Sequence, residues 1–200
     1  MLTDSRVNPA AEDNFAIKSA SRKGHHKVVA LLLKDPRVDP SAEDNFPVAF
    51  ASYEGHSEVV GLLLSRSQVD PSNNANFPIR AASARGHTGV VALLLPHPRV
   101  DPSDGNNSAI KDASRNGHFE VVALLLADAR VDPAVDDNIT IKDASSNGHI
   151  EVVKLLLADP RVDPSAEDNY AVIWANLFEH DQIVALLLQD PRVDSSVIQS

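Results

Sequence analysis

The 200-residue sequence contains no cysteine, and it has only one methionine, one tryptophan and two tyrosines. Without cysteine the chain can form neither a disulfide framework nor a thiolate metal site, which fits a reducing compartment, so we expect a cytoplasmic protein. Long apolar runs are absent too. Stretches such as Val121 to Ala127 end after about seven residues, whereas a membrane-spanning helix needs about 20. The sequence therefore predicts no contact with a membrane.

Basic residues are fewer than acidic ones, 18 against 28, and the formal net charge is -10. This charge repels nucleic-acid phosphates at long range, so we expect no nucleic-acid partner. The first 14 residues are polar and acidic and lack the apolar core of a secretory signal. A hydrophobic content of 43% indicates that the chain is ordered and soluble.

Motifs for catalysis or cofactor binding are also missing. The eight glycines form no phosphate-binding loop, no dinucleotide fingerprint and no nucleophile elbow. Pairs such as Asp44-Asn45 lack the alternating oxygens and the closing glutamate of a calcium loop. We therefore expect a protein that is not an enzyme, with no catalytic residue, no metal, no cofactor and no small-molecule substrate.

What the sequence does contain is a repeat of 31 residues. Its clearest mark is a triplet of leucines, which begins at Leu31, Leu62, Leu93, Leu124, Leu155 and Leu186. A unit of this size cannot bury its own apolar face, so the copies must stack on one another. We predict a single array over 1–200, with a partial leading loop at 1–13, repeats at 14–44, 45–75, 76–106, 107–137 and 138–168, and a C-terminal capping repeat at 169–200.

The first residues repeat a loop that otherwise lies between copies. Residues 5–14 are nearly the same string as residues 160–169. The chain therefore begins in the loop that would follow an earlier repeat. Two interpretations remain open, namely that an N-terminal cap was never present or that the chain is part of a longer array.

The third copy shows what one repeat predicts. Asn76 is a favourable N-cap, Pro78 suits a first helical turn, and Gly86 suits a left-handed C-terminal stop. A second helix follows from Thr88 to Leu95. It has almost no polar face, so we expect it to be buried on nearly all sides. In the loop beyond it, Val100 is expected to hold the chain against the core.

These residues resemble the ankyrin repeat, whose pattern runs Thr-Pro-Leu-His, Ala-Ala, Gly-His, Val-Val and then a run of leucines. Pro47 and Pro78 keep the proline, five copies keep the Gly-His pair, and almost all keep Val-Val and the leucines. The resemblance covers about six copies. It implies an all-α solenoid of six helix-turn-helix repeats.

Three departures from that pattern stand out. The first threonine is replaced by Phe15, Phe46, Phe77, Ser108, Ile139 or Tyr170, and the histidine of the same tetrapeptide by Lys18, Ala49, Arg80, Lys111, Lys142 or Ile173. The period falls short of the usual value of about 33. The turn reads Pro-Arg-Val-Asp-Pro, and its prolines remove donors from a β ladder, so we expect short irregular loops in place of β-hairpin fingers.

Histidine recurs once in each repeat, at His25, His56, His87, His118, His149 and His180. Equivalent positions of stacked helices lie about 8–10 Å apart, whereas zinc holds each nitrogen at about 2.1 Å. A shared metal site is therefore not expected. We predict that each imidazole caps a helix or bridges to the neighbouring loop.

The positions that vary among the copies lie on one face of each first helix, where a partner could select them. By its resemblance to ankyrin arrays, this face is expected to line a concave groove. The predicted partner-binding residues are Arg22, Lys23, Phe50, Tyr53, Glu54, Arg80, Arg85, Arg115, Asn116, Ser146, Asn147, Trp174 and Leu177.

Within this set, Phe50 and Tyr53 form an aromatic spot flanked by basic residues, a mixture typical of binding hot spots. The alternative is that Phe50 packs between repeats while the arginines pair with loop acids such as Asp39 or Asp70. For the basic row of Lys18, Arg80, Lys111 and Lys142 we favour a solvated or internally paired role. Near the C-terminus, Trp174, Leu177 and Phe178 form either a cap or an exposed patch.

Together these features favour a monomeric, non-catalytic scaffold. It would recognise a protein partner, whose identity the sequence does not specify, through the concave first-helix face and the loop tips. The alternative is a structural spacer in a longer repeat protein whose function lies in other domains. Exposure of Phe50, Tyr53, Arg85 and Arg115 on one continuous surface would favour the scaffold, and burial or internal pairing would favour the spacer.

Overall fold

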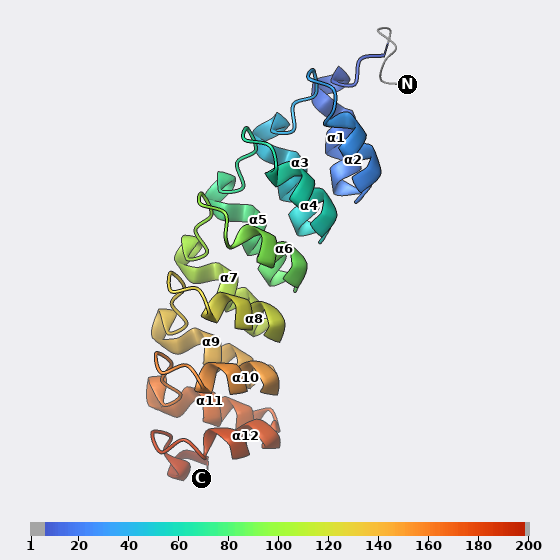
Figure 1. The fold of residues 1–200 in the computed structure, drawn as a ribbon. Coiled ribbons are helices and arrows are strands. Elements are labelled where there is room, and N and C mark those ends of the chain that lie inside the picture. Colours follow the sequence, from blue (N-terminus) through green and yellow to red (C-terminus); the bar gives the residue numbers. More distant parts are fainter. Residues whose placement is uncertain (1–6, 199–200) are drawn as a thin grey trace. The chain divides into compact units, whose positions relative to one another are not determined.

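The computed structural model describes residues 7–198, which form twelve α-helices, one short 3-10 helix and no β-strand (Figure 1). Each repeat contributes a first helix of 12 residues and a second helix of 7 or 8. The first helices are α1 (Ala11–Arg22), α3 (Ala42–Tyr53), α5 (Asn73–Ala84), α7 (Asp104–Arg115), α9 (Val135–Ser146) and α11 (Ala166–Leu177). The second helices are α2 (His26–Leu32), α4 (Ser57–Leu64), α6 (Thr88–Leu94), α8 (Phe119–Leu126), α10 (Ile150–Leu157) and α12 (Asp181–Leu187), with η1 (Ser195–Ile198) at the end.

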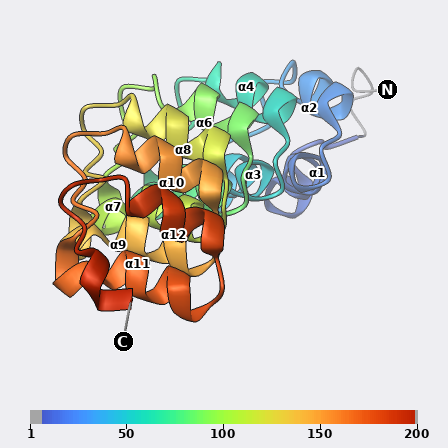
Figure 2. The ribbon, with the colours of Figure 1, turned by 90° about the horizontal axis from the view of Figure 1, so that it is seen from below.

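The helices belong to two compact units, one of residues 7–82 and 87–101 and one of residues 83–86 and 102–198. In the first unit α1 packs on α3, while α2, α4 and α6 pack in order. In the second unit α7, α9 and α11 form one row and α8, α10 and α12 form another (Figure 2). The predicted stacking of helix-turn-helix repeats is thus confirmed within each unit. The single array over 1–200 stays a prediction, and residues 1–6 of its leading loop lie outside the described residues.

Each first helix begins with a left-handed turn that we did not predict. In the second copy Glu43, Asp44 and Asn45 have φ values of 49°, 51° and 65°. The same turn occurs in all six copies, and its third residue is always asparagine: Asn14, Asn45, Asn76, Asn107, Asn138 and Asn169. A left-handed conformation costs about 1–2 kcal/mol per ordinary residue and less for asparagine, so contacts outside the turn must hold it.

This turn corrects the interpretation of Asn76 as an N-cap. An N-cap residue has an extended backbone, but Asn76 has a φ of 53° and lies inside the left-handed turn. Its side-chain oxygen accepts a hydrogen bond from the backbone N–H of Asp101, at 2.9 Å. Asn76 therefore links its own turn to the loop of the next repeat.

The second helices are less buried than we expected. The middle leucine of every triplet is buried, at Leu32, Leu63, Leu94, Leu125, Leu156 and Leu187. The first leucine is not, because it lies off the stripe that faces the other helices, and Leu31 and Leu93 are 53% and 39% exposed. The expectation of burial on nearly all sides was therefore wrong for the outer face.

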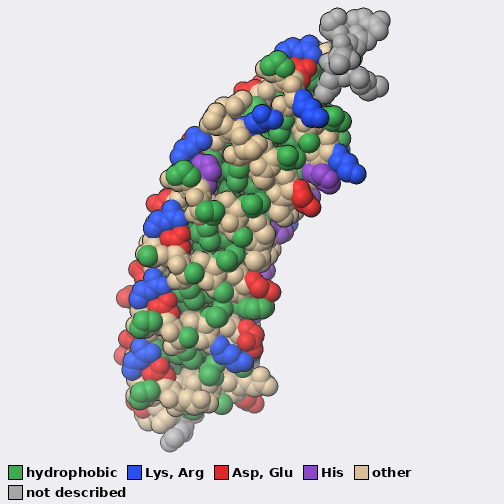
Figure 3. All heavy atoms as spheres, viewed as in Figure 1, with side chains coloured by type: hydrophobic (Ala, Val, Ile, Leu, Met, Phe, Trp, Pro, Cys, Tyr) green, Lys and Arg blue, Asp and Glu red, His purple; other side chains and the backbone are tan. Residues whose placement is uncertain are grey.

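The loops agree with the sequence analysis. The valine of each loop is buried, at Val38, Val69, Val100, Val131, Val162 and Val193. Since residues 7–198 contain no strand, the loops are irregular as predicted. Within each unit, basic and acidic side chains lie next to one another at the side that carries these loops (Figure 3).

Candidate functional site

Histidines join neighbouring repeats. The Nε2 atom of His56 lies 3.0 Å from the carbonyl oxygen of Arg22, and His87, His118, His149 and His180 make the same contact, each with a residue 34 positions earlier. Each of these carbonyl groups belongs to the last residue of the preceding first helix. The prediction that the imidazole caps a helix or bridges to the neighbouring loop is therefore confirmed for these five, as caps of a helix. No group of three or more metal-ligating side chains occurs in residues 7–198.

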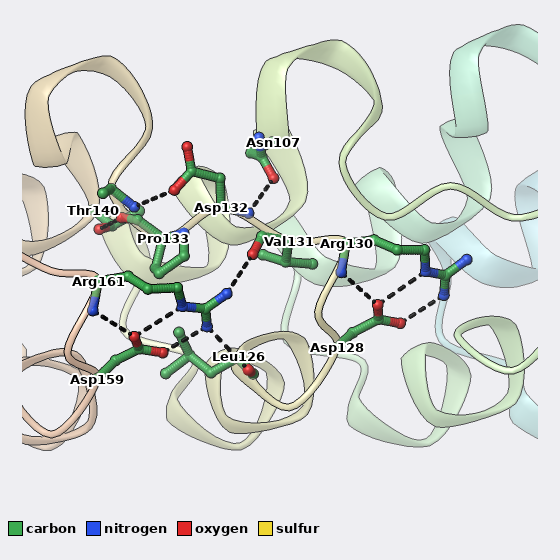
Figure 4. A network of polar contacts seen from close by, with 11 residues as sticks. Asn107, Leu126, Asp128, Arg130, Val131, Asp132, Pro133, Thr140, Asp159 and Arg161 are labelled. Atoms are coloured by element: carbon green, nitrogen blue, oxygen red, sulfur yellow. Dashed lines mark hydrogen bonds and ion pairs between the residues drawn. The ribbon is translucent and has the colours of Figure 1, made fainter.

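Asparagine makes a second connection between copies. The side-chain oxygen of Asn107 accepts a hydrogen bond of 2.8 Å from the backbone N–H of Asp132, which is shown in Figure 4. The other five asparagines of the left-handed turns bond in the same way to an aspartate 25 residues later. In every copy, the same hydrogen bond therefore joins the left-handed turn to the loop that begins the next repeat.

Arginine makes a third connection. The guanidinium of Arg161 donates to the carboxylate of Asp159 and, at 2.8 Å, to the carbonyl oxygen of Val131 in the preceding loop (Figure 4). The hydrogen bond from Arg161 lowers the pKa of Asp159. The equivalent bond from Arg37 lowers the pKa of Asp35 from 3.8 to about 2. The aspartate and arginine charges of these pairs bind one another within the loops, so they are not free to bind a partner.

The basic row on the first helices is largely paired internally, as we favoured. Lys18 bonds to Glu43, Lys111 to Asp136 at 2.9 Å, and Lys142 to Glu167 at 2.8 Å, and each acid belongs to the left-handed turn of the next repeat. At the same position Arg80, one of the predicted binding residues, donates to the carbonyl oxygen of Ala75 at 3.1 Å.

The predicted aromatic spot is part of a larger cluster in the first unit. The rings of Phe46 and Phe50 stack at 4.0 Å between centroids, Tyr53 lies 6.3 Å from Phe50, and Phe77 stacks on Tyr53 at 6.5 Å. The Cζ atom of Arg22 lies 5.6 Å from the centre of the Phe50 ring. All four rings are half-buried, so they pack on one another and still reach the surface.

Two hollows open beside this cluster. The first, which we name the Ala49 hollow, has a volume of about 390 Å³ and is lined mainly by Asp44, Phe46, Ala49, Phe50, Asn74 and Phe77. The second, the basic hollow, has a volume of about 740 Å³ and is lined mainly by Phe15, Lys18, Arg22, Lys23, Glu43 and Glu54. Volumes of this size suit the side chains of a bound ligand.

Three aromatic residues of these hollows were not among the predicted binding residues. Phe15, Phe46 and Phe77 line them but were treated only as departures from the ankyrin pattern. A usable signal was present, because the first position of the helical segment is aromatic in these three copies and again at Tyr170. Such a run of rings at one repeat position indicates a shared surface.

In the second unit the predicted binding residues mostly bond within the stack. The Nε atom of Arg115 lies 2.8 Å from the carboxylate of Asp143. Asn116 donates to the carbonyl oxygen of Ala84, while Ser146 and Asn147 both donate to the carbonyl oxygen of Asp143. Arg115 and Asn116 therefore join neighbouring repeats, whereas Ser146 and Asn147 bond to the end of their own helix.

The last repeat carries the second aromatic group. The ring of Trp174 lies 5.2 Å from Tyr170 and 5.6 Å from Phe178, and Leu177 beside them is 62% exposed. The rings contact one another along one helix while the leucine faces the solvent. Whether this group caps the repeats or binds a partner stays a prediction.

The structure defines a class, that of helix-pair repeat proteins, and the comparisons with known proteins agree with it. A family model of three ankyrin repeats matches residues 48–137, and a model of a single ankyrin repeat matches residues 143–169. Since the two matches together span more than half of the chain, the chain belongs to the ankyrin-repeat family.

The solved structures include similar proteins. One is the crystal structure of EF0377, an ankyrin repeat protein, with a TM-score of 0.73 and 26% sequence identity over 87% of this chain and 96% of that chain. The comparison with curated proteins gave no match. Among the described residues, no helix has both the length and the apolar character that crossing a membrane requires.

Proposed function

We propose that this chain is a scaffold that binds a protein partner through the first-helix face of its first unit. Ankyrin repeats are generally modules for protein–protein interaction, and the family is typically non-enzymatic. The observation that supports this site is the half-buried aromatic cluster of Phe46, Phe50, Tyr53 and Phe77 beside two hollows. Aromatic and arginine side chains that border a pocket are typical of binding hot spots.

The charges beside the cluster favour a protein partner. The basic hollow presents Arg22 and Lys23, both exposed, next to Glu43 and Glu54, so it offers both signs of charge within one surface. A nucleic acid would instead need a continuous basic surface, and the chain as a whole has a net charge of -10. The proposal therefore takes the chain as a monomeric cytoplasmic scaffold with no nucleic-acid or small-molecule ligand.

A second role, as a structural spacer, is favoured in the second unit by the internal bonds of Arg115, Asn116, Ser146 and Asn147. Side chains that are already bonded within the chain, to a neighbouring repeat or to their own helix, offer less to a partner. We therefore assign partner contacts to the first-helix face of the first unit and to the loop tips.

The proposal is tested by affinity capture from a cell extract, with the immobilised chain as bait and mass spectrometry as the readout. We expect the variants Arg22→Glu/Lys23→Glu and Phe50→Ala/Tyr53→Ala to lose the proteins that the wild type retains. The matched control is Lys27→Ala/Lys34→Ala, two exposed residues of the second-helix side. Circular dichroism confirms that each variant is folded. Equal capture by all four proteins would contradict the assignment of this face.

A further inference from the structure

Two rows of residues in neighbouring repeats vary together. The first row occupies one first-helix position and the second row the first residue of the next left-handed turn, 25 residues later. In order, the pairs are Lys18 with Glu43, Ala49 with Asn74, Arg80 with Gly105, Lys111 with Asp136, and Lys142 with Glu167. Lysine always has an acid as its counterpart, and where lysine is missing the acid is missing too.

Where this first-helix position is a lysine, acidic and aromatic groups surround its ammonium. Lys142 is 3% exposed, its Nζ atom lies 2.8 Å from Glu167, and it lies 5.5 Å from the centre of the Tyr170 ring. The Nζ atom of Lys18 bonds to Glu43 and lies 3.7 Å from Asp13 in its own left-handed turn. Both ammonium groups thus bind an acid of the next repeat, together with an acid of the same repeat at Lys18 and an aromatic ring of the next repeat at Lys142.

The Ala49 hollow is the same site without its lysine. Ala49 ends in a methyl group where Lys18 and Lys142 carry an ammonium, and the space beside it is open. Three residues that line the hollow occupy the repeat positions of the groups that hold the lysines. Asp44 is equivalent to Asp13, which lies near Lys18. Asn74 and Phe77 are equivalent to Glu167 and Tyr170, which lie near Lys142.

The charge of the hollow is suited to a cation. Among the described residues, its lining includes the carboxylates of Glu43, Asp44 and Asp70 and no lysine or arginine. Glu43 is bonded to Lys18, and Asp70 accepts a hydrogen bond of 2.7 Å from Ser72. In the part of the chain that the structure describes, the carboxylate of Asp44 has no ion-pair or hydrogen-bond partner, and its residue is exposed. One negative charge is therefore available to a ligand.

We propose that the Ala49 hollow receives a lysine side chain from the partner protein, in the place that the chain's own lysines occupy in other repeats. This inference rests on the proposed function, because it specifies what the first-helix face recognises. The ammonium would meet the Asp44 carboxylate, the Asn74 side-chain oxygen and the face of Phe77, where a cation is attracted to the ring. The hydrocarbon stem would lie along Phe46 and Phe50.

The test uses the full chain and defined peptides. An acetylated and amidated peptide, Gly-Ser-Ala-Lys-Ala-Ser-Gly, is titrated into the isotope-labelled protein while its backbone amides are followed by NMR. A peptide with norleucine in place of lysine keeps the hydrocarbon stem without the charge. Free spermidine carries the ammonium groups without a peptide. We expect saturable shifts at Ala49, Asn74 and Phe77 with the lysine peptide alone.

Two variants locate the site. Asp44→Asn removes the available carboxylate and is expected to weaken binding about tenfold or more, as loss of a hydrogen bond to a charged group usually does. Ala49→Lys/Asn74→Glu rebuilds the pair formed by Lys142 and Glu167 and should abolish binding with a melting temperature at or above that of the wild type. Asp168→Asn, at the position equivalent to Asp44 in the last repeat, is the matched control and should bind normally.

The outcomes separate this inference from the proposed function. Equal binding of the lysine and norleucine peptides, undiminished binding by folded Ala49→Lys/Asn74→Glu, or shifts with spermidine alone would overturn the lysine site. If affinity capture depends on Arg22 and Lys23 but no peptide binds, the scaffold stands and the lysine site is wrong. If the lysine peptide binds as expected while the wild type captures no protein from the extract, the lysine site stands and the proposed function is wrong.

Discussion

The imidazole of His149 lies against Gly117, with its Nε2 atom 2.9 Å from the carbonyl oxygen of Arg115 at the end of the preceding first helix. A Cβ atom at Gly117 would be 2.6 Å from Nδ1 of the same ring. The glycine therefore does two things, since it ends a helix with a φ of +76° and it leaves room for the next repeat's histidine. The Gly-His pair is thus a contact between copies and not only a stop signal within one.

Substitution of Gly117 by alanine should destabilise the protein. The left-handed backbone and the displaced ring together should lower the free energy of unfolding by about 1–3 kcal/mol. Chemical denaturation measures the change. The control is Gly61→Ala in the interior of α4, where the nearest atom would be 4.0 Å away. Because alanine favours a helix, that variant should gain about 0.5–1 kcal/mol, and a loss of equal size in both would refute our account.

The asparagine of the left-handed turn can be tested at Asn138, which accepts a hydrogen bond of 2.7 Å from the N–H of Asp163. Asn138→Ala loses this bond and keeps an unfavourable φ, so we expect the free energy of unfolding to fall by about 2–4 kcal/mol. Asn138→Gly loses the bond but adopts φ of 63° without strain, so its cost should be about 1–2 kcal/mol. Thermal and urea unfolding compare the two. Identical costs would mean that the backbone conformation does not matter.

The loop aspartates predict a loss of stability in acid. Hydrogen bonding from Arg37 lowers the pKa of Asp35 to about 2, and bonds from Arg161 and Arg192 lower the pKa values of Asp159 and Asp190. A carboxylate whose pKa is lower in the folded state stabilises the fold above its unfolded pKa, near 3.9, and this contribution is lost as pH falls toward 2. The melting temperature should fall over that range.

The residue-level check on this pH dependence is Arg37→Gln, followed by carboxyl NMR. The substitution should return the Asp35 titration midpoint from about 2 toward its usual 3.8. A midpoint that remains near 2 would show that Arg37 is not the cause. Lys34→Gln, three residues earlier and exposed, serves as the control and should leave the midpoint unchanged.

Buried serines predict the opposite effect on stability. The hydroxyl of Ser52 is buried and has no hydrogen-bond partner among residues 7–198, and the same holds for Ser21, Ser83, Ser114 and Ser145 at the same repeat position. Ser52→Ala removes an unsatisfied group and should leave stability unchanged or raise it by about 1 kcal/mol. Ser72→Ala is the contrast, because its hydroxyl donates to Asp70 at 2.7 Å, and it should be destabilising. If Ser52→Ala proved the worse of the two, the hydroxyl must have an acceptor.

Much of the fold was predictable because the sequence displays each structural requirement in five or six copies. The glycine stops, the buried loop valines and the bridging histidines all follow from a residue type that recurs at one position. The left-handed turns were not predictable in this way. Local conformational preferences oppose three successive left-handed residues, and the bond that holds Asn107 in place comes from Asp132, which belongs to the next copy.

The candidate site was predictable in part. Phe50 and Tyr53, which we predicted as binding residues, are half-buried members of the aromatic cluster, but their neighbours Phe46 and Phe77 were overlooked. The missing step was to compare residues 25 positions apart. Lys18 and Glu43 look like independent surface charges in the sequence, and only the packing of consecutive first helices shows that they are one ion pair.

All of these links join a copy to its immediate neighbour, at fixed separations of 25 residues for asparagine and lysine and 34 for histidine. Recombination that removes or duplicates 31 consecutive residues therefore again places an asparagine 25 residues before an aspartate, and a histidine 34 residues after the end of a first helix. The lysine pairs differ between copies, so they are kept only where the lysine and its own acid stay 25 residues apart. Removal or duplication of a segment one residue longer or shorter would disrupt the hydrogen bonds, the glycine contact and the core at once. Proteins of this design can therefore change length during evolution by unequal crossing-over in whole repeats, because the contacts between neighbouring copies are kept.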